Sequence, residues 1–146
     1  MKNISFLTGI RRQIPFIVLG VFIVSCSSMI AVFDQQAYLN ATTLKAEAST
    51  LMDQAVEPYI DHSESVKFFM TRIDAAYEYA RGIPRNEESA KQWEILKNPE
   101  GNLLGGFFKL WKKNGTLMRG DIEAIKKNTL EGFDKIIRLE AAKIKK

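Results

Sequence analysis

The apolar residues of this chain follow two different patterns, an unbroken run near the N-terminus and a helical spacing after it. The run covers residues 14–24 and reads IPFIVLGVFIV. From residue 34 onward, apolar residues recur mostly every three or four positions, which places them on one side of an α-helix. No segment there alternates strictly between apolar and polar residues, as a half-buried β-strand does. We therefore predict an all-α domain after the N-terminal run.

Two long helical stretches are expected before residue 82, one over residues 34–57 and one over residues 58–81. Their apolar stripes are Ala37, Ala41, Leu44, Ala48, Leu51 and Ala55 in the first, and His62, Val66, Phe69, Ile73, Ala76 and Ala80 in the second. Pro58 removes a backbone donor and clashes with the preceding turn, so it either kinks one helix or begins another. The stripes are nearly in phase across Pro58, so one kinked helix ~70 Å long is as compatible with the sequence as two helices. Gly82 and Pro84 predict the end of this region.

Three further helices are expected in the rest of the chain. One begins near Asn86 and the last begins at Asp121, and both residues are predicted N-caps. A short helix over residues 103–113 follows a turn at residues 98–102. The buried side of the last helix is predicted to contain Ile122, Ile125, Thr129, Phe133, Ile136, Ile137 and Ile144. Short loops favour antiparallel neighbours, so we predict a small antiparallel bundle of four to five helices, the first one long and kinked or interrupted at Pro58.

Composition and charge narrow the class of protein. The chain has 146 residues, of which 46% are hydrophobic and 26% charged, as in folded globular proteins. The net charge is +4, but Lys2, Arg11 and Arg12 precede the apolar run, so the remainder has a net charge of +1. That balance is not the charge pattern of a nucleic-acid-binding domain, and we expect no nucleic acid as a partner.

The cysteine and histidine counts bear on metal and redox chemistry. The chain has one cysteine, Cys26, and one histidine, His62, so it lacks the pair that an intramolecular disulfide needs. A zinc site collects several such ligands, so we expect no metal and no cofactor. The sequence also has no G-x-S-x-G, no phosphate-binding glycine loop and no H-E-x-x-H motif. We therefore expect a protein that is not an enzyme.

The N-terminal region has the three zones of a secretory signal peptide. Basic residues precede the apolar run, and the small residues Ser25 and Cys26 follow it. The end of the run, Ile23-Val24-Ser25-Cys26, resembles the lipobox of bacterial lipoproteins over about the first 26 residues. The resemblance implies that the Cys26 thiol receives a diacylglycerol, that cleavage occurs before Cys26, and that the new amine is acylated, for example with palmitate. Two or more acyl chains anchor a protein stably.

An uncleaved membrane anchor is the alternative interpretation. The uncharged stretch continues from Gln13 to Phe33, which is 21 residues and long enough to span a bilayer. We expect a signal peptide over residues 1–25 (or an anchor to about residue 33), a tether over 26–35 and a helical domain over 36–146. Either anchor places the domain in the cell envelope, facing the periplasm or exterior. The resemblance also implies sorting to the outer membrane in a Gram-negative organism, because Ser27 follows the cysteine.

The most unusual segment of the domain is residues 103–113, in which aromatic residues stand beside lysines. Phe107, Phe108 and Trp111 either fill the core or form a surface for a partner protein, a ligand or a membrane. The pair Gly105-Gly106 weakens an isolated helix and therefore indicates close packing or a hinge.

His62 has two interpretations, since it lies on the apolar stripe of its predicted helix between Asp61 and Glu64. It is either a partly buried histidine with a satisfied hydrogen bond or a group that senses pH. We predict the first.

The leading functional hypothesis is a membrane-tethered envelope lipoprotein with a non-enzymatic structural or protein-binding domain, whose partner is an unidentified envelope protein. A signal-anchored helical interaction protein is a variant of it. The alternative is a helical bundle that binds a small molecule or lipid in a cavity lined by Phe69, Phe107, Trp111 and Phe133.

Overall fold

The computed structural model describes residues 31–145, and this part of the chain contains helices and no β-strand. The α-helices are α1 (Gln35–Asp53), α2 (Tyr59–Gly82), α3 (Glu87–Lys97), α4 (Leu104–Asn114) and α5 (Arg119–Ala141). Two 3₁₀ turns, Gln54–Val56 and Ala142–Lys145, follow α1 and α5. The prediction of an all-α bundle is confirmed.

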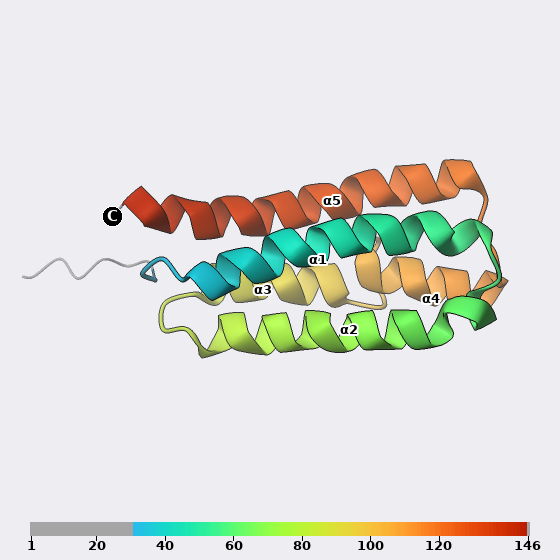
Figure 1. The fold of residues 1–146 in the computed structure, drawn as a ribbon. Helices are drawn as coiled ribbons and strands as arrows, with labels where there is room; N and C mark the ends of the chain where they lie inside the picture. Colours follow the sequence, from blue (N-terminus) through green and yellow to red (C-terminus); the bar gives the residue numbers. More distant parts are fainter. Residues whose placement is uncertain (1–30, 146) are drawn as a thin grey trace, which may run out of the picture.

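The helices form an up-and-down bundle of four rods, and the third rod is interrupted (Figure 1). α2 returns beside α1, α3 and α4 follow one another along the third side, and α5 returns. Each of α1 and α3 contacts both α2 and α5, which closes the bundle. The chain enters the described part at the end where α5 finishes, at the left of Figure 1.

The possibility of one continuous helix through Pro58 is wrong, because the chain reverses there. α1 ends at Asp53, a 3₁₀ turn follows, and Pro58 has the extended conformation φ −61°, ψ 128° immediately before α2. Two backbone hydrogen bonds hold this reversal against the turn between α4 and α5. The Tyr59 amide donates to the Gly115 carbonyl at 2.7 Å, and the Leu117 amide donates to the Ala55 carbonyl at 2.8 Å.

The core consists of the predicted apolar stripes. All six stripe residues of α1 and its 3₁₀ turn are buried, as are the five apolar stripe residues of α2. On the last helix, Ile122, Phe133 and Ile136 are buried as expected. Ile144 is the exception, with 61% of its surface exposed. It lies in the 3₁₀ turn after α5, where three residues make a turn, so the 3.6-residue spacing no longer predicts the buried side.

Asn86 stands directly before α3, where an N-cap is predicted, but its side chain makes no capping hydrogen bond to that helix. The Asn86 side chain instead donates from Nδ2 to the carbonyl of Ala80 at 3.0 Å, near the end of α2. Its Oδ1 accepts a hydrogen bond from Lys143, which comes from the far end of the chain. α5 begins at Arg119, so Asp121 lies in its first turn and not before it. The contact between Asn86 and Lys143 joins distant parts of the chain, which a local pattern does not contain, and the prediction of Asp121 as an N-cap is wrong.

Gly105 and Gly106 mark a close approach between α4 and the end of α3. A Cβ on Gly105 would overlap the carbonyl oxygen of Lys97, and a Cβ on Gly106 would overlap that of Gly101. The close packing that this glycine pair predicts is therefore confirmed. The glycines allow α4 to begin against the preceding turn and not as a straight continuation of α3.

Candidate functional site

The aromatic residues of α4 lie mainly in the core. Phe107 and Trp111 are 1% and 0% exposed, and the Trp111 indole donates from Nε1 to the carbonyl of Glu57 at 3.0 Å. These two rings therefore offer no surface to a partner, a ligand or a membrane. They fill the core, which is the first of the two interpretations given above. Phe108 is 5% exposed, and it also lines a groove.

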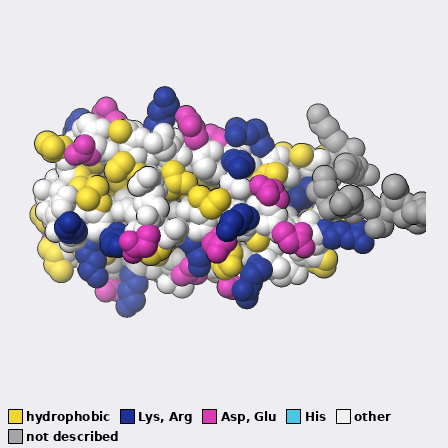
Figure 2. All heavy atoms as spheres, turned by 180° about the vertical axis from the view of Figure 1, so that it is seen from behind, with side chains coloured by type: hydrophobic (Ala, Val, Ile, Leu, Met, Phe, Trp, Pro, Cys, Tyr) yellow, Lys and Arg dark blue, Asp and Glu magenta, His cyan; other side chains and the backbone are white. Residues whose placement is uncertain are grey.

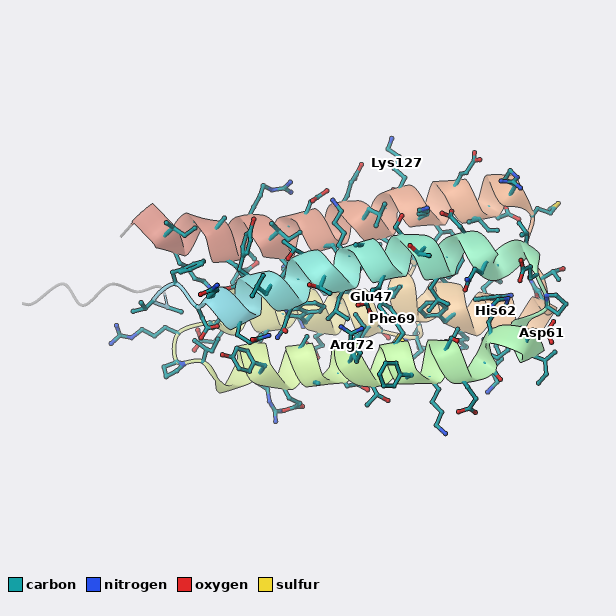
Figure 3. All side chains as sticks on the ribbon, in the orientation of Figure 1. Glu47, Asp61, His62, Phe69, Arg72 and Lys127 are labelled. Atoms are coloured by element: carbon teal, nitrogen blue, oxygen red, sulfur yellow. The ribbon has the colours of Figure 1, made fainter. Side chains whose placement is uncertain are left out.

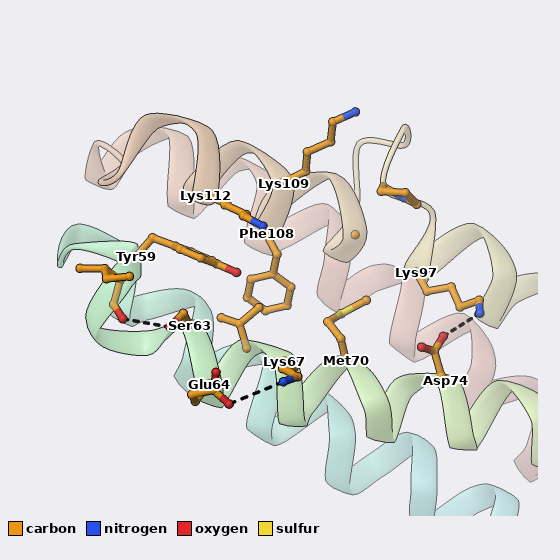
Figure 4. Close-up of a pocket in the computed structure, with 14 residues that line it drawn as sticks. Tyr59, Ser63, Glu64, Lys67, Met70, Asp74, Lys97, Phe108, Lys109 and Lys112 are labelled. Atoms are coloured by element: carbon orange, nitrogen blue, oxygen red, sulfur yellow. Dashed lines mark hydrogen bonds and ion pairs between the residues drawn. The ribbon is translucent and has the colours of Figure 1, made fainter.

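This groove lies between α2 and α4 and has a volume of about 800 Å³ (Figure 4). Its floor is apolar and is formed mainly by Val66 and Met70 of α2 and by Phe108 of α4. Pro99, in the turn after α3, and Gly105, at the start of α4, also line the groove. The interruption of the third rod thus positions the groove beside α2.

Lysines dominate the rim of the groove, which carries four lysines and two carboxylates. Three lysines form ion pairs, Lys97 with Asp74 at 2.7 Å, Lys109 with Glu100 at 2.6 Å and Lys67 with Glu64 at 3.9 Å. Lys112 has no hydrogen bond or ion pair with another described residue. Basic and acidic side chains are mixed over the face shown in Figure 2. Because that face has no large region of one charge, attraction of a charged ligand to the groove depends on single side chains such as Lys112.

Tyr59, the first residue of α2, contributes a second polar group to this rim. Its ring packs edge-on against Trp111, with a centroid distance of 5.4 Å. Its hydroxyl points into the groove toward Phe108 (Figure 4), and Lys112, the residue after Trp111 in α4, lines the same groove. That hydroxyl forms no hydrogen bond within the described part of the chain. One end of the groove therefore combines an ammonium group with a hydroxyl donor above an apolar floor.

His62 lies outside the groove, at the end of the bundle near the α1–α2 turn (Figure 3). Its Nε2 is 2.6 Å from Glu57 Oε2, and its ring contacts Trp111 with a centroid distance of 5.5 Å. The side chain is 15% exposed. These contacts confirm the prediction of a partly buried histidine with a satisfied hydrogen bond.

A buried polar cluster lies near the C-terminal end of α5, and no local sequence pattern singled it out. Lys143 and Glu140 are 6% and 1% exposed, and Lys143 Nζ lies 2.6 Å from Glu140 Oε2. Lys143 also contacts Asn86 and, at 3.5 Å, Ser89. The one sequence feature that could have indicated the burial of Glu140 is its position, which continues the apolar stripe of Phe133 and Ile136. The cluster joins the end of α5 and the turn after it to Asn86 before α3 and to Ser89 in α3.

Two residues with raised pKa values, Tyr79 and Arg72, lie away from the groove. The Tyr79 hydroxyl donates to Asp34 at 3.0–3.1 Å, and this bond raises the pKa of Tyr79 above its ordinary value. The hydrogen bond from Arg72 to Glu47, which joins α2 to α1, raises the pKa of Arg72 (Figure 3). Both pairs stabilise the α1–α2 side of the bundle, and neither takes part in the groove.

The N-terminal predictions, including the signal peptide over 1–25 and lipidation at Cys26, fall outside the described residues. Within residues 31–145, no helix combines the length and hydropathy that crossing a bilayer requires. The same part of the chain holds no group of three or more His, Cys, Asp or Glu side chains placed to bind a metal ion.

Comparison of the whole chain with protein-family models, with curated proteins and with solved structures finds no match.

Proposed function

We propose that this protein is a membrane-tethered, non-enzymatic binding module of the bacterial cell envelope, whose helical bundle holds an amphiphilic molecule in the α2–α4 groove. The observation that carries this proposal is the groove itself. Its volume of about 800 Å³ lies within the ~300–1,000 Å³ that small-molecule sites occupy, and apolar side chains form its floor. Such a surface binds an apolar chain by removing it from water.

The packing inside the bundle indicates that the groove, and not a central cavity, is the candidate ligand site. Phe69, Phe107, Trp111 and Phe133, which would line such a cavity, are all buried. They pack against neighbouring rings, as Phe133 does edge-on against Trp93 at 5.8 Å. None of the four lines the α2–α4 groove. Phe107 and Trp111, two of the three residues of the alternative aromatic surface, are also buried, so the groove is the better candidate surface.

The proposed tether gives the groove access to its ligand. α1 begins nine residues after Cys26, the proposed site of lipidation. A short linker keeps a binding site at a high effective concentration relative to the surface that holds it. A bundle anchored in this way lies close to the membrane from which single-chain amphiphiles dissociate. Long-range electrostatic attraction is therefore not required for them to reach the groove.

The test replaces Met70, on the floor of the groove, with the photoreactive residue p-benzoylphenylalanine in the full chain. Cells are irradiated, and the peptide that contains residue 70 is analysed by mass spectrometry. The matched control places the same residue at Met118, which is 75% exposed and outside the groove. We expect a discrete small-molecule adduct at position 70 and none at position 118.

Two other results would reject the proposal in different ways. A protein adduct at position 70, with no small molecule, would mean that the groove docks a partner protein, as the leading sequence-based hypothesis has it. No adduct at position 70, with a correctly folded variant, would mean that the groove is empty in the envelope.

A further inference from the structure

The polar end of the groove has the composition of an anion site. The Lys112 ammonium has no partner among the described residues, and the Tyr59 hydroxyl has none either. Both lie at the Phe108 end of the floor (Figure 4). An ammonium and a hydroxyl donor form charge-assisted hydrogen bonds with an anionic oxygen, which are stronger than bonds between neutral groups.

The apolar floor begins beside this polar end. From Phe108 it continues past Met70 toward Lys97 and Asp74 (Figure 4). α2 follows the groove from Tyr59 to Asp74, which spans ~22 Å at 1.5 Å per residue. A single extended acyl chain of similar length fits along the groove, with its charged end at one extremity.

We propose that the occupant of the groove is a long-chain fatty acid. Its carboxylate is bound by Lys112 Nζ and the Tyr59 hydroxyl, and its chain lies over Phe108 and Met70. Charge complementarity carries this assignment, because Lys67, Lys97 and Lys109 are each paired with a carboxylate and Lys112 is the rim lysine without such a partner among the described residues. The inference depends on the proposed function and goes beyond it by naming the chemical class of the ligand.

The experiment uses the full chain in phosphatidylcholine vesicles and a palmitate analogue with a diazirine in its acyl chain. The matched probe is the corresponding hexadecanol analogue, which has the same chain and no charge. After irradiation, labelled peptides are mapped by mass spectrometry. At neutral pH we expect the palmitate probe to label the peptides containing Met70 and Phe108 about tenfold more than the alcohol probe, as one charge-assisted hydrogen bond warrants.

Variants assign the charge to one side chain. Lys112→Gln is expected to reduce palmitate labelling about tenfold and to leave hexadecanol labelling unchanged. Lys113→Gln is the matched control, because Lys113 is exposed, adjacent and absent from the groove lining. Tyr59→Phe keeps the ring against Trp111 and removes only the hydroxyl, so it is expected to give a smaller reduction. Circular dichroism confirms that each variant is folded.

The outcomes separate the inference from the proposed function. Equal labelling by both probes, unaffected by Lys112→Gln, would overturn the fatty-acid assignment and leave an apolar binding groove. Failure of both probes to label the groove would overturn both. Unlabelled lysophosphatidylglycerol is a further competitor. If it displaces the palmitate probe more effectively than palmitate does, the occupant is an anionic lysophospholipid, and the assignment to a free fatty acid is wrong.

Discussion

The close approach at Gly106 allows a quantitative test of the packing that positions the groove. Gly106→Ala adds one methyl group to a helical residue, which by helix propensity alone favours folding by about 0.5–1 kcal/mol. The added Cβ would, however, overlap the carbonyl oxygen of Gly101. The obstacle is backbone and cannot rotate away, so the cost is near the upper end of the ~1–3 kcal/mol typical of overpacking. We expect a net loss of about 2 kcal/mol.

The assay is thermal unfolding of the full chain, followed by circular dichroism. For a domain of this size, a loss of about 2 kcal/mol lowers Tm by roughly 6–12 °C. The matched control is Gly82→Ala, because a Cβ at the last residue of α2 meets no atom within 4 Å. That control is expected to keep or slightly raise Tm. A Gly106→Ala protein that melts at or above the wild-type temperature would refute the described packing of α4 on the preceding turn.

Three further predictions test other parts of the molecule. Glu140→Gln and Lys143→Met should each cost about 3 kcal/mol in urea unfolding, because each leaves a buried charge without its partner, and the double variant should lose less than the sum. Asp34→Ala should cost about 1 kcal/mol as a lost N-cap and should lower the pKa of Tyr79 in a spectrophotometric titration, whereas Asp34→Asn should keep the cap. Because folding raises the pKa of Tyr79, its hydrogen bond to Asp34 stabilises the domain at pH values below the ordinary tyrosine pKa of 10.0. This stabilisation is lost as the pH rises through the folded-state pKa of Tyr79. Finally, the intact mass of membrane-extracted protein should lack residues 1–25 and include acyl chains, and Cys26→Ser should abolish both changes. Retention of residues 1–25 without acyl mass would reject lipidation.

The sequence predicted the helices and their buried sides well, because each rests on a local period. The alanine stripe of α1 and the Val66–Ala80 stripe of α2 are buried as expected. Pro58 shows the limit of that reasoning. In-phase stripes arise both from one kinked helix and from two antiparallel helices that face the same core, so only tertiary structure separates the two.

The groove could not be predicted, since it depends on how far α4 departs from the direction of α3. Gly105 and Gly106 indicated a close contact, but the partner carbonyls come from a turn whose path the sequence does not specify. The same limit applies to Lys112 and Tyr59. They are 53 positions apart in the chain, and only the reversal at Pro58 and the return of α4 bring them to one rim.

Native mass spectrometry of the full chain, purified from its own membranes in a mild detergent, detects a ligand in the groove. The wild-type protein is expected to carry one non-covalently bound amphiphile. Met70→Glu, which places a carboxylate on the apolar floor of the groove, should lose that mass. Met118→Glu, a matched change outside the groove, should keep it. Equal occupancy in all three proteins, or no bound amphiphile in the wild type, would contradict the account.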